Sequence, residues 1–69
     1  MLIQDNKAVK VGMILYGASD WEEKVLKVRD DSAELISVEY DEDAQDYKEV
    51  GRTYWVTPKD LRRRCVSVE

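Results

Sequence analysis

The chain has no histidine and no phenylalanine, and it has only one cysteine, one proline and three glycines among 69 residues. Histidine is the commonest general base near neutral pH and the commonest zinc ligand, so its absence argues against sites built on it. Cys65 has no partner for an internal disulfide, and its setting indicates a small strand residue. With no glycine-rich phosphate loop and a small core, the sequence predicts no enzyme, no metal and no cofactor.

Long apolar runs are missing as well. No window holds 18 consecutive apolar residues, and the N-terminal M-L-I-Q-D-N-K lacks the basic and apolar regions of a secretory signal. We therefore expect a cytoplasmic location. The length predicts a single domain over residues 1–69, with its core in 9–68 and with flexible residues 1–8.

Charge of each sign is concentrated in a different part of the chain, although the net charge is only −4. Five acids and one lysine occupy residues 41–49, whereas five basic residues and one acid occupy residues 52–64. The acids are Asp41, Glu42, Asp43, Asp46 and Glu49, and the bases are Arg52, Lys59, Arg62, Arg63 and Arg64. The protein is thus dipolar, and its total charge alone predicts no partner.

Alternating apolar positions predict five short strands. The first is V-K-V-G-M-I-L-Y at 9–16, with Val9, Val11, Met13 and Leu15 on one face and a bulge or close approach at Gly12. The second covers 21–29, with Leu26 and Val28 facing inward. The third covers 33–40, where Ile36, Val38 and Tyr40 share a face, and it should form an antiparallel hairpin with the second. The fourth and fifth cover 52–56 and 62–68.

Two connections leave room for helical turns. Residues 43–50 can form one or two helical turns, with Asp41 or Asp43 as N-cap, or an extended connection. T-P-K-D-L at 57–61 predicts a 3₁₀ turn, because Pro58 suits a turn start and cannot donate to a sheet. Five strands without an amphipathic helix favour an all-β, antiparallel barrel.

The order of these segments resembles the SH3-like barrels of the Tudor and chromo-barrel type. The resemblance is carried by V-G-M-I-L-Y, W-E-E-K-V-L-K-V, L-I-S-V-E-Y-D and Y-W-V-T-P-K-D-L-R, and it spans roughly residues 9–64. It implies a five-stranded barrel that is a non-catalytic binding module. Tudor-like barrels use an aromatic cage to read methylated lysine or arginine, so the resemblance implies that alternative as well.

Aromatic residues stand at the ends of the predicted strands. Tyr16, Trp21 and Tyr40 are expected at one rim of the barrel, with Tyr47 from the acidic stretch. Aromatic faces attract cations by about 0.5–2 kcal/mol per contact. The predicted peptide-binding residues are Tyr16, Trp21, Tyr40, Asp41, Glu42, Asp43, Asp46 and Tyr47. The alternative is that the rings only pack over the barrel mouth with their hydroxyls in water.

The acidic stretch D-E-D-A-Q-D does not fit a calcium loop of the EF-hand type. Such a loop has an acid at its fifth position, glycine at the sixth and glutamate at the twelfth, where this chain has Gln45, Asp46 and Arg52. No metal site is therefore predicted there.

The basic residues suggest a different partner. Alternate strand residues face the same side, so Arg62 and Arg64 could follow phosphates together, with Arg52, Trp55 and Lys59 nearby. Internal pairing with the acidic stretch is the simpler explanation. The sequence thus predicts a module that binds a basic or extended segment of a protein partner. The size of the chain fits a small accessory or inhibitory protein of bacterial or phage origin. A nucleic-acid-associated barrel is the alternative.

Overall fold

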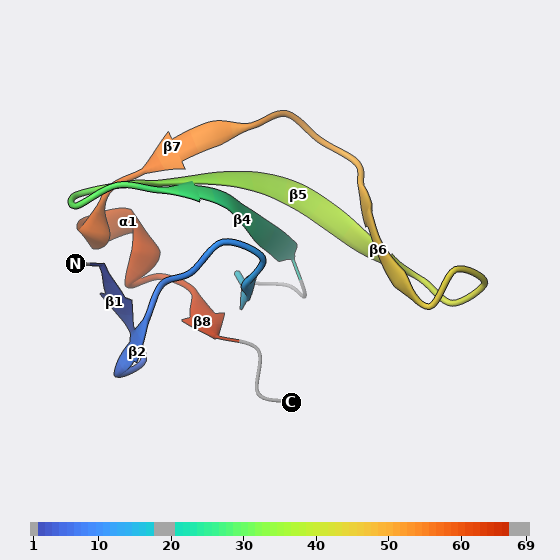
Figure 1. Cartoon of the computed structure of the whole chain (residues 1–69), viewed down its shortest axis with the longest axis horizontal. Helices are drawn as coiled ribbons and strands as arrows, with labels where there is room; N and C mark the ends of the chain where they lie inside the picture. Colours follow the sequence, from blue (N-terminus) through green and yellow to red (C-terminus); the bar gives the residue numbers. More distant parts are fainter. Residues whose placement is uncertain (1, 18–20, 67–69) are drawn as a thin grey trace.

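The structure is a computed structural model that describes residues 2–17 and 21–66, and it is mainly β. Figure 1 shows the elements in chain order. They are β1 (Ile3–Gln4), β2 (Lys7–Ala8), β3 (Ile14–Tyr16), β4 (Glu22–Val28), β5 (Ala33–Asp41), β6 (Asp46–Glu49), β7 (Tyr54–Val56), α1 (Pro58–Leu61) and β8 (Cys65–Val66). The all-β prediction is confirmed. The predicted fifth strand extends to 68, and Ser67 and Val68 lie outside the described residues.

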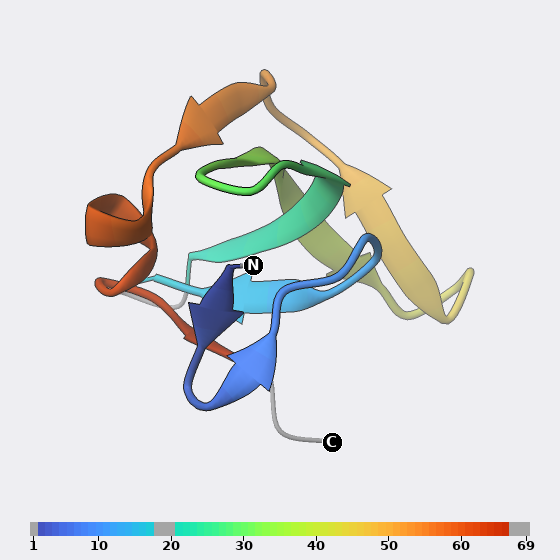
Figure 2. The same ribbon diagram turned by 60° about the vertical axis from the view of Figure 1, so that its left-hand side comes forward.

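The main sheet is antiparallel, with the order β6-β5-β4-β3-β8. β5 pairs with β4 along one edge, and along its other edge it pairs first with β7 and then with β6. The sheet curls around the core, and the segment from β7 through α1 leads to β8 at the opposite edge (Figure 2). Within the described residues neither sheet closes on itself, so a closed five-stranded barrel is not confirmed.

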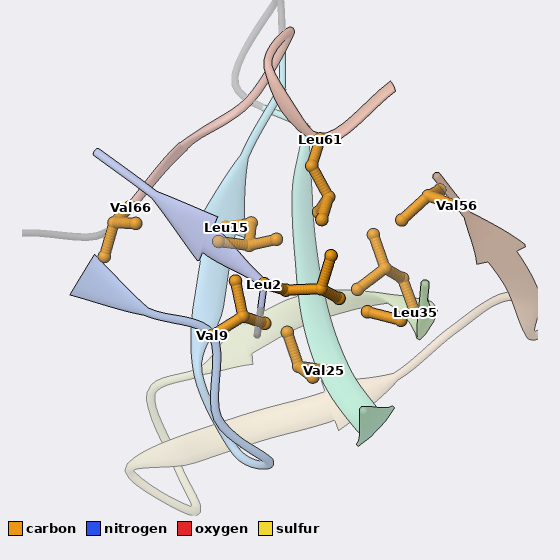
Figure 3. Packing of buried hydrophobic residues seen from close by; sticks show 9 residues of the cluster. Leu2, Val9, Leu15, Val25, Leu35, Val56, Leu61 and Val66 are labelled. Carbon is orange, nitrogen blue, oxygen red and sulfur yellow. The ribbon is translucent and has the colours of Figure 1, made fainter. Parts of the chain in front are cut away.

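The core lies inside this curl and is aliphatic (Figure 3). It consists of Leu2, Val9, Leu15, Val25, Ala33, Leu35, Val56, Leu61 and Val66, with Met13 packed against it. The prediction had placed the core after residue 8, but Leu2 is only 4% exposed. Leu2 directly precedes β1 of the two-stranded sheet β1–β2, and the Val9 N–H donates to Leu2 O at 2.9 Å. Leu2 is therefore part of the core.

The first predicted strand is interrupted at Gly12. This glycine has φ +91°, and its N–H donates to Val25 O at 2.8 Å. A positive φ turns the chain and breaks the alternation of faces. Val11 is consequently 67% exposed instead of facing the core beside Leu15, and β3 begins only at Ile14.

The inward face of β4 differs from the prediction. Glu23 and Val25 are fully buried, whereas Leu26 is half-buried and Val28 is exposed. The register with β5 shifts between Val25 and Lys27, as in a β-bulge, so one alternation does not hold along the whole strand. A buried glutamate before the bulge was not expected from composition.

The β4–β5 hairpin is confirmed, with Glu22 opposite Val38 and Val28 opposite Ala33. Ala33 and Leu35 supply the core face of β5. Ile36 and Val38 alternate with them and are also buried, so β5 is covered on both faces over this stretch.

Residues 43–50 do not form helical turns. Asp41 and Asp46 are opposite each other across a four-residue turn, and β6 then pairs with β5. Gln45 has a left-handed φ of 54°, which ends any helical continuation. The turn predicted at 57–61 is present, but it is the short α-helix α1 and not a 3₁₀ turn, because the N–H groups of Leu61 and Arg62 donate to Thr57 O and Pro58 O, four residues earlier.

Candidate functional site

Three of the four predicted aromatics come together on one face of the sheet. Tyr40 of β5 and Tyr47 of β6 are directly opposite each other, with ring centroids 5.3 Å apart and planes at 75°. This is the edge-to-face geometry that aromatic pairs favour. Tyr40 is 50% exposed, so the pair forms part of the surface.

Tyr16 and Glu22 complete this group. They are opposite each other in the β3–β4 pair, and the side chains of both interact with that of Tyr47. Burial, followed by these contacts with Glu22 and Tyr16, raises the pKa of Tyr47 to about 12. The phenol thus stays protonated beside the carboxylate at neutral pH. We call Tyr16, Glu22, Tyr40 and Tyr47 the tyrosine face.

Trp21 directly precedes β4, so continued alternation would place it on the side of Glu23. The residue is 56% exposed, and it lines a pocket of about 440 Å³ together with Glu22 of the tyrosine face, Val38, Val50 and Arg52. A second pocket next to Trp21, of about 260 Å³, is lined by Gly17, Glu23, Arg63 and Arg64.

The predicted acidic residues lie in the β5–β6 hairpin, at the edge of the tyrosine face (Figure 1). Oδ1 of Asp41 accepts from the backbone N–H of Asp43 at 3.0 Å and of Ala44 at 3.3 Å, which stabilises the turn. Oδ1 of Asp46 accepts from the Tyr47 N–H at 2.7 Å. Glu42 and Asp43 are exposed at the tip, and their charges face solvent. Two of the four acids therefore shape the hairpin.

Arg64, which was predicted as a phosphate contact, is held inside the molecule. Its Nε donates to Oε1 of Glu23 at 2.6 Å, its Nη1 to Asp60 O at 2.7 Å and its Nη2 to the Tyr54 hydroxyl at 2.9 Å. Glu23 is 1% exposed, and its Oε2 has no partner among the described residues. The guanidinium thus stabilises a buried carboxylate.

The other predicted basic-site residues are spread over separate elements. Arg52 precedes β7, Lys59 lies in α1 and Arg62 follows α1, and all three are exposed. Trp55 lies on β7 under the guanidinium of Arg29, which is 4.2 Å from the ring centroid. Arg29 contributes a basic group that the sequence did not single out.

Sequence reasoning also missed Glu22, Glu23 and the contacts of the N-terminal hairpin. The side chain of Gln4 donates to Arg64 O, and Oδ2 of Asp5 accepts from the Val66 N–H at 2.8 Å. The Tyr16-to-Glu22 pairing follows once the β3–β4 register is known, but no sequence signal fixes that register.

No helix among the described residues is long and apolar enough to cross a membrane, and no cluster of three or more acids or cysteines in that part of the chain could hold a metal ion. Comparison with known proteins identifies no relative: no family model, no curated protein and no solved structure matches this chain.

Proposed function

We propose that this protein is a non-catalytic module that binds a basic, extended segment of a protein partner at the tyrosine face and the adjoining acidic hairpin. The observation that carries the proposal is the convergence of Tyr16, Glu22 and Tyr40, from three strands, on Tyr47. Exposed aromatic surface of this kind is enriched in protein interfaces, where tyrosine contributes large contact area at low entropic cost.

Charge selects the kind of segment. The hairpin carries Asp41, Glu42, Asp43, Asp46 and Glu49 against a single lysine, and Glu22 adds a carboxylate within the tyrosine face. Acids around an aromatic surface steer positive side chains toward it, and aromatic rings then hold them by cation–π attraction. A lysine- or arginine-rich strand of a partner fits both properties.

Two other partners fit less well. A methylated side chain in a cage needs an opening between aromatic walls, whereas Tyr40 and Tyr47 are in direct edge-to-face contact at 5.3 Å. A nucleic acid needs aligned phosphate contacts, whereas Arg64 already donates to three acceptors within the chain. Both remain outcomes of the binding experiments.

We also propose that the fold is an open relative of the SH3-like barrels of the Tudor type. The order β8-β3-β4-β5, with β6 and β7 following β5, supports this proposal because the last strand lies beside the first strand of the main sheet. The helical turn α1 just before β8 has the position expected from that resemblance.

The proposal is tested by calorimetric titration with a disordered peptide of about twelve residues that alternates arginine with serine. We expect it to bind, and the same peptide with glutamate for arginine should not bind. Tyr40→Ala should weaken binding about tenfold, because Tyr40 is half exposed and its truncation spares the core.

Trp55→Ala is the matched control, since Trp55 is also an exposed aromatic on β5's neighbour strand but lies beside Arg29. It should leave the affinity unchanged. Loss of binding in Trp55→Ala with full binding in Tyr40→Ala would overturn the assignment of the surface. Absence of any binding to the arginine peptide at low salt would overturn the partner class.

A further inference from the structure

We propose that the partner segment binds as an added antiparallel strand along the free edge of β6. This inference rests on the proposed function and specifies its geometry. In this binding mode the backbone of the partner supplies affinity, and its alternate side chains contact the tyrosine face.

β6 is an edge strand. It pairs with β5 on one side only and stands at the end of the sheet order. No strand of the described part of the chain pairs with its other side, although the connection between β2 and β3 comes near β6 in Figure 2, where Gly12 lines a pocket with Asp46 and Tyr47. An edge of this kind presents backbone donors and acceptors that a further strand can pair with.

The register identifies which backbone groups point outward. Val50 N donates to Ser37 O at 2.9 Å, and Val50 continues the register in which Glu49 is opposite Val38. Hydrogen-bonded and non-hydrogen-bonded pairs alternate in an antiparallel ladder. Lys48 therefore bonds inward to Glu39, whereas the N–H and C=O groups of Tyr47 and Glu49 point away from β5.

One of these four outward groups is already engaged. The Tyr47 N–H donates to Oδ1 of Asp46, which agrees with an outward direction. The Tyr47 carbonyl and both groups of Glu49 remain for a partner strand, and no residue in the described part of the chain pairs with them. A short partner strand can therefore form both backbone hydrogen bonds opposite Glu49, but only one opposite Tyr47.

The side chains of β6 define the occupant. Tyr47 and Glu49 are two residues apart and share a face, so a partner strand places alternate residues next to them. Basic residues at those alternate positions meet Glu49 and the exposed ring surface of Tyr47. A second copy of this chain would instead bring its own acidic hairpin against this one, so charge favours a basic partner over self-pairing.

Backbone N-methylation of the partner peptide tests the inference without altering the protein. An antiparallel added strand forms hydrogen bonds to its neighbour through the backbone of every second residue. Methylation of the amides that form these bonds should therefore abolish binding, whereas methylation of the intervening amides should preserve it. The probe is the arginine–serine peptide, methylated either at the arginine amides or at the serine amides. We expect at least a tenfold difference in affinity between the two peptides.

Amide hydrogen exchange gives the second measurement. Binding should slow exchange of the Glu49 N–H about tenfold or more, whereas the Lys48 N–H, which bonds within the sheet, should change little. Equal affinity of the two methylated peptides, with Tyr40→Ala still weakening them, would overturn strand addition and leave the proposed function intact. Failure of the unmethylated peptide to bind would overturn both. Self-association through β6 without peptide would overturn the choice of occupant.

Discussion

The side chains of Glu23 and Arg64, which lie 41 positions apart in the chain, form an ion pair of 2.6 Å between Oε1 and Nε with the carboxylate 1% exposed. The pair connects β4 to the segment between α1 and β8, so it joins the middle of the main sheet to its last strand. Removing one member of a buried pair leaves an uncompensated charge, whereas removing both avoids that cost.

Arg64→Leu should therefore lower the free energy of unfolding by about 3 kcal/mol, measured by urea denaturation. The double variant Glu23→Leu, Arg64→Leu should lose much less than the two single variants summed. Arg62→Leu is the exposed control and should be near neutral. If Arg64→Leu does not fold, Arg64→Lys gives the same comparison with a smaller loss. Additive single and double effects would contradict the pair.

The N-terminal hairpin holds the C-terminal strand through Asp5, whose Oδ2 accepts from the Val66 N–H. Asp5 also has φ 51°, a conformation that alanine tolerates poorly. Asp5→Ala should cost about 1–2 kcal/mol and speed exchange of the Val66 amide. Asp5→Asn keeps an acceptor oxygen and tolerates this φ, so it should retain most of the stability; an equal loss in both variants would argue against the hydrogen bond.

Gly51 is required by a close approach to β5. A Cβ at this position would be 2.9 Å from the Ser37 Cβ and 3.1 Å from its Oγ. Gly51→Ala should destabilise the protein by about 1–3 kcal/mol in thermal or urea unfolding. Gly17→Ala, whose Cβ would meet Trp21 only at 3.6 Å, should be tolerated. The reverse order of the two effects would contradict this packing.

The raised pKa of Tyr47 predicts an alkaline dependence. A folded pKa of about 12 against 10.0 for the free group means that protonated Tyr47 stabilises the fold fully below pH 10, and this contribution is lost as pH rises to about 12. Ultraviolet titration should show a phenol ionisation near pH 12. Tyr47→Phe should remove this step. Absence of the step from the unaltered protein, or its persistence in Tyr47→Phe, would contradict the contact with Glu22 and Tyr16.

The strand content and the β4–β5 hairpin follow from alternation and turn residues, which are local signals. The inward face of β4 does not, because Glu23 resembles a solvent-exposed residue until Arg64 is brought next to it. For a related reason, the sequence alone did not distinguish the β6 strand from a helical turn. Its stability comes from pairing with β5 and from the Tyr40–Tyr47 contact, and neither is visible in residues 43–50 alone.

The candidate site was partly predictable as well. Tyr16 and Tyr40 were expected together because they stand at the ends of predicted strands, with Tyr47 joining them from the acidic stretch, and the structure brings all three to one face. Trp21 was also expected with them, and the structure places it in a pocket with Glu22 and Val38, one position before the residue that is opposite Tyr16. The position of Arg64 depends on its three acceptors, which no spacing in the sequence reveals.

Chemical-shift mapping of the labelled protein with the arginine–serine peptide, followed by a short single-stranded oligonucleotide at about 50 mM salt, tests the central claim most directly. The account predicts that the peptide shifts the amides of Tyr16, Tyr40, Tyr47 and Glu49, and that the oligonucleotide shifts none of them. Shifts confined to Arg29, Trp55 and Arg62, or a response to the oligonucleotide alone, would contradict it.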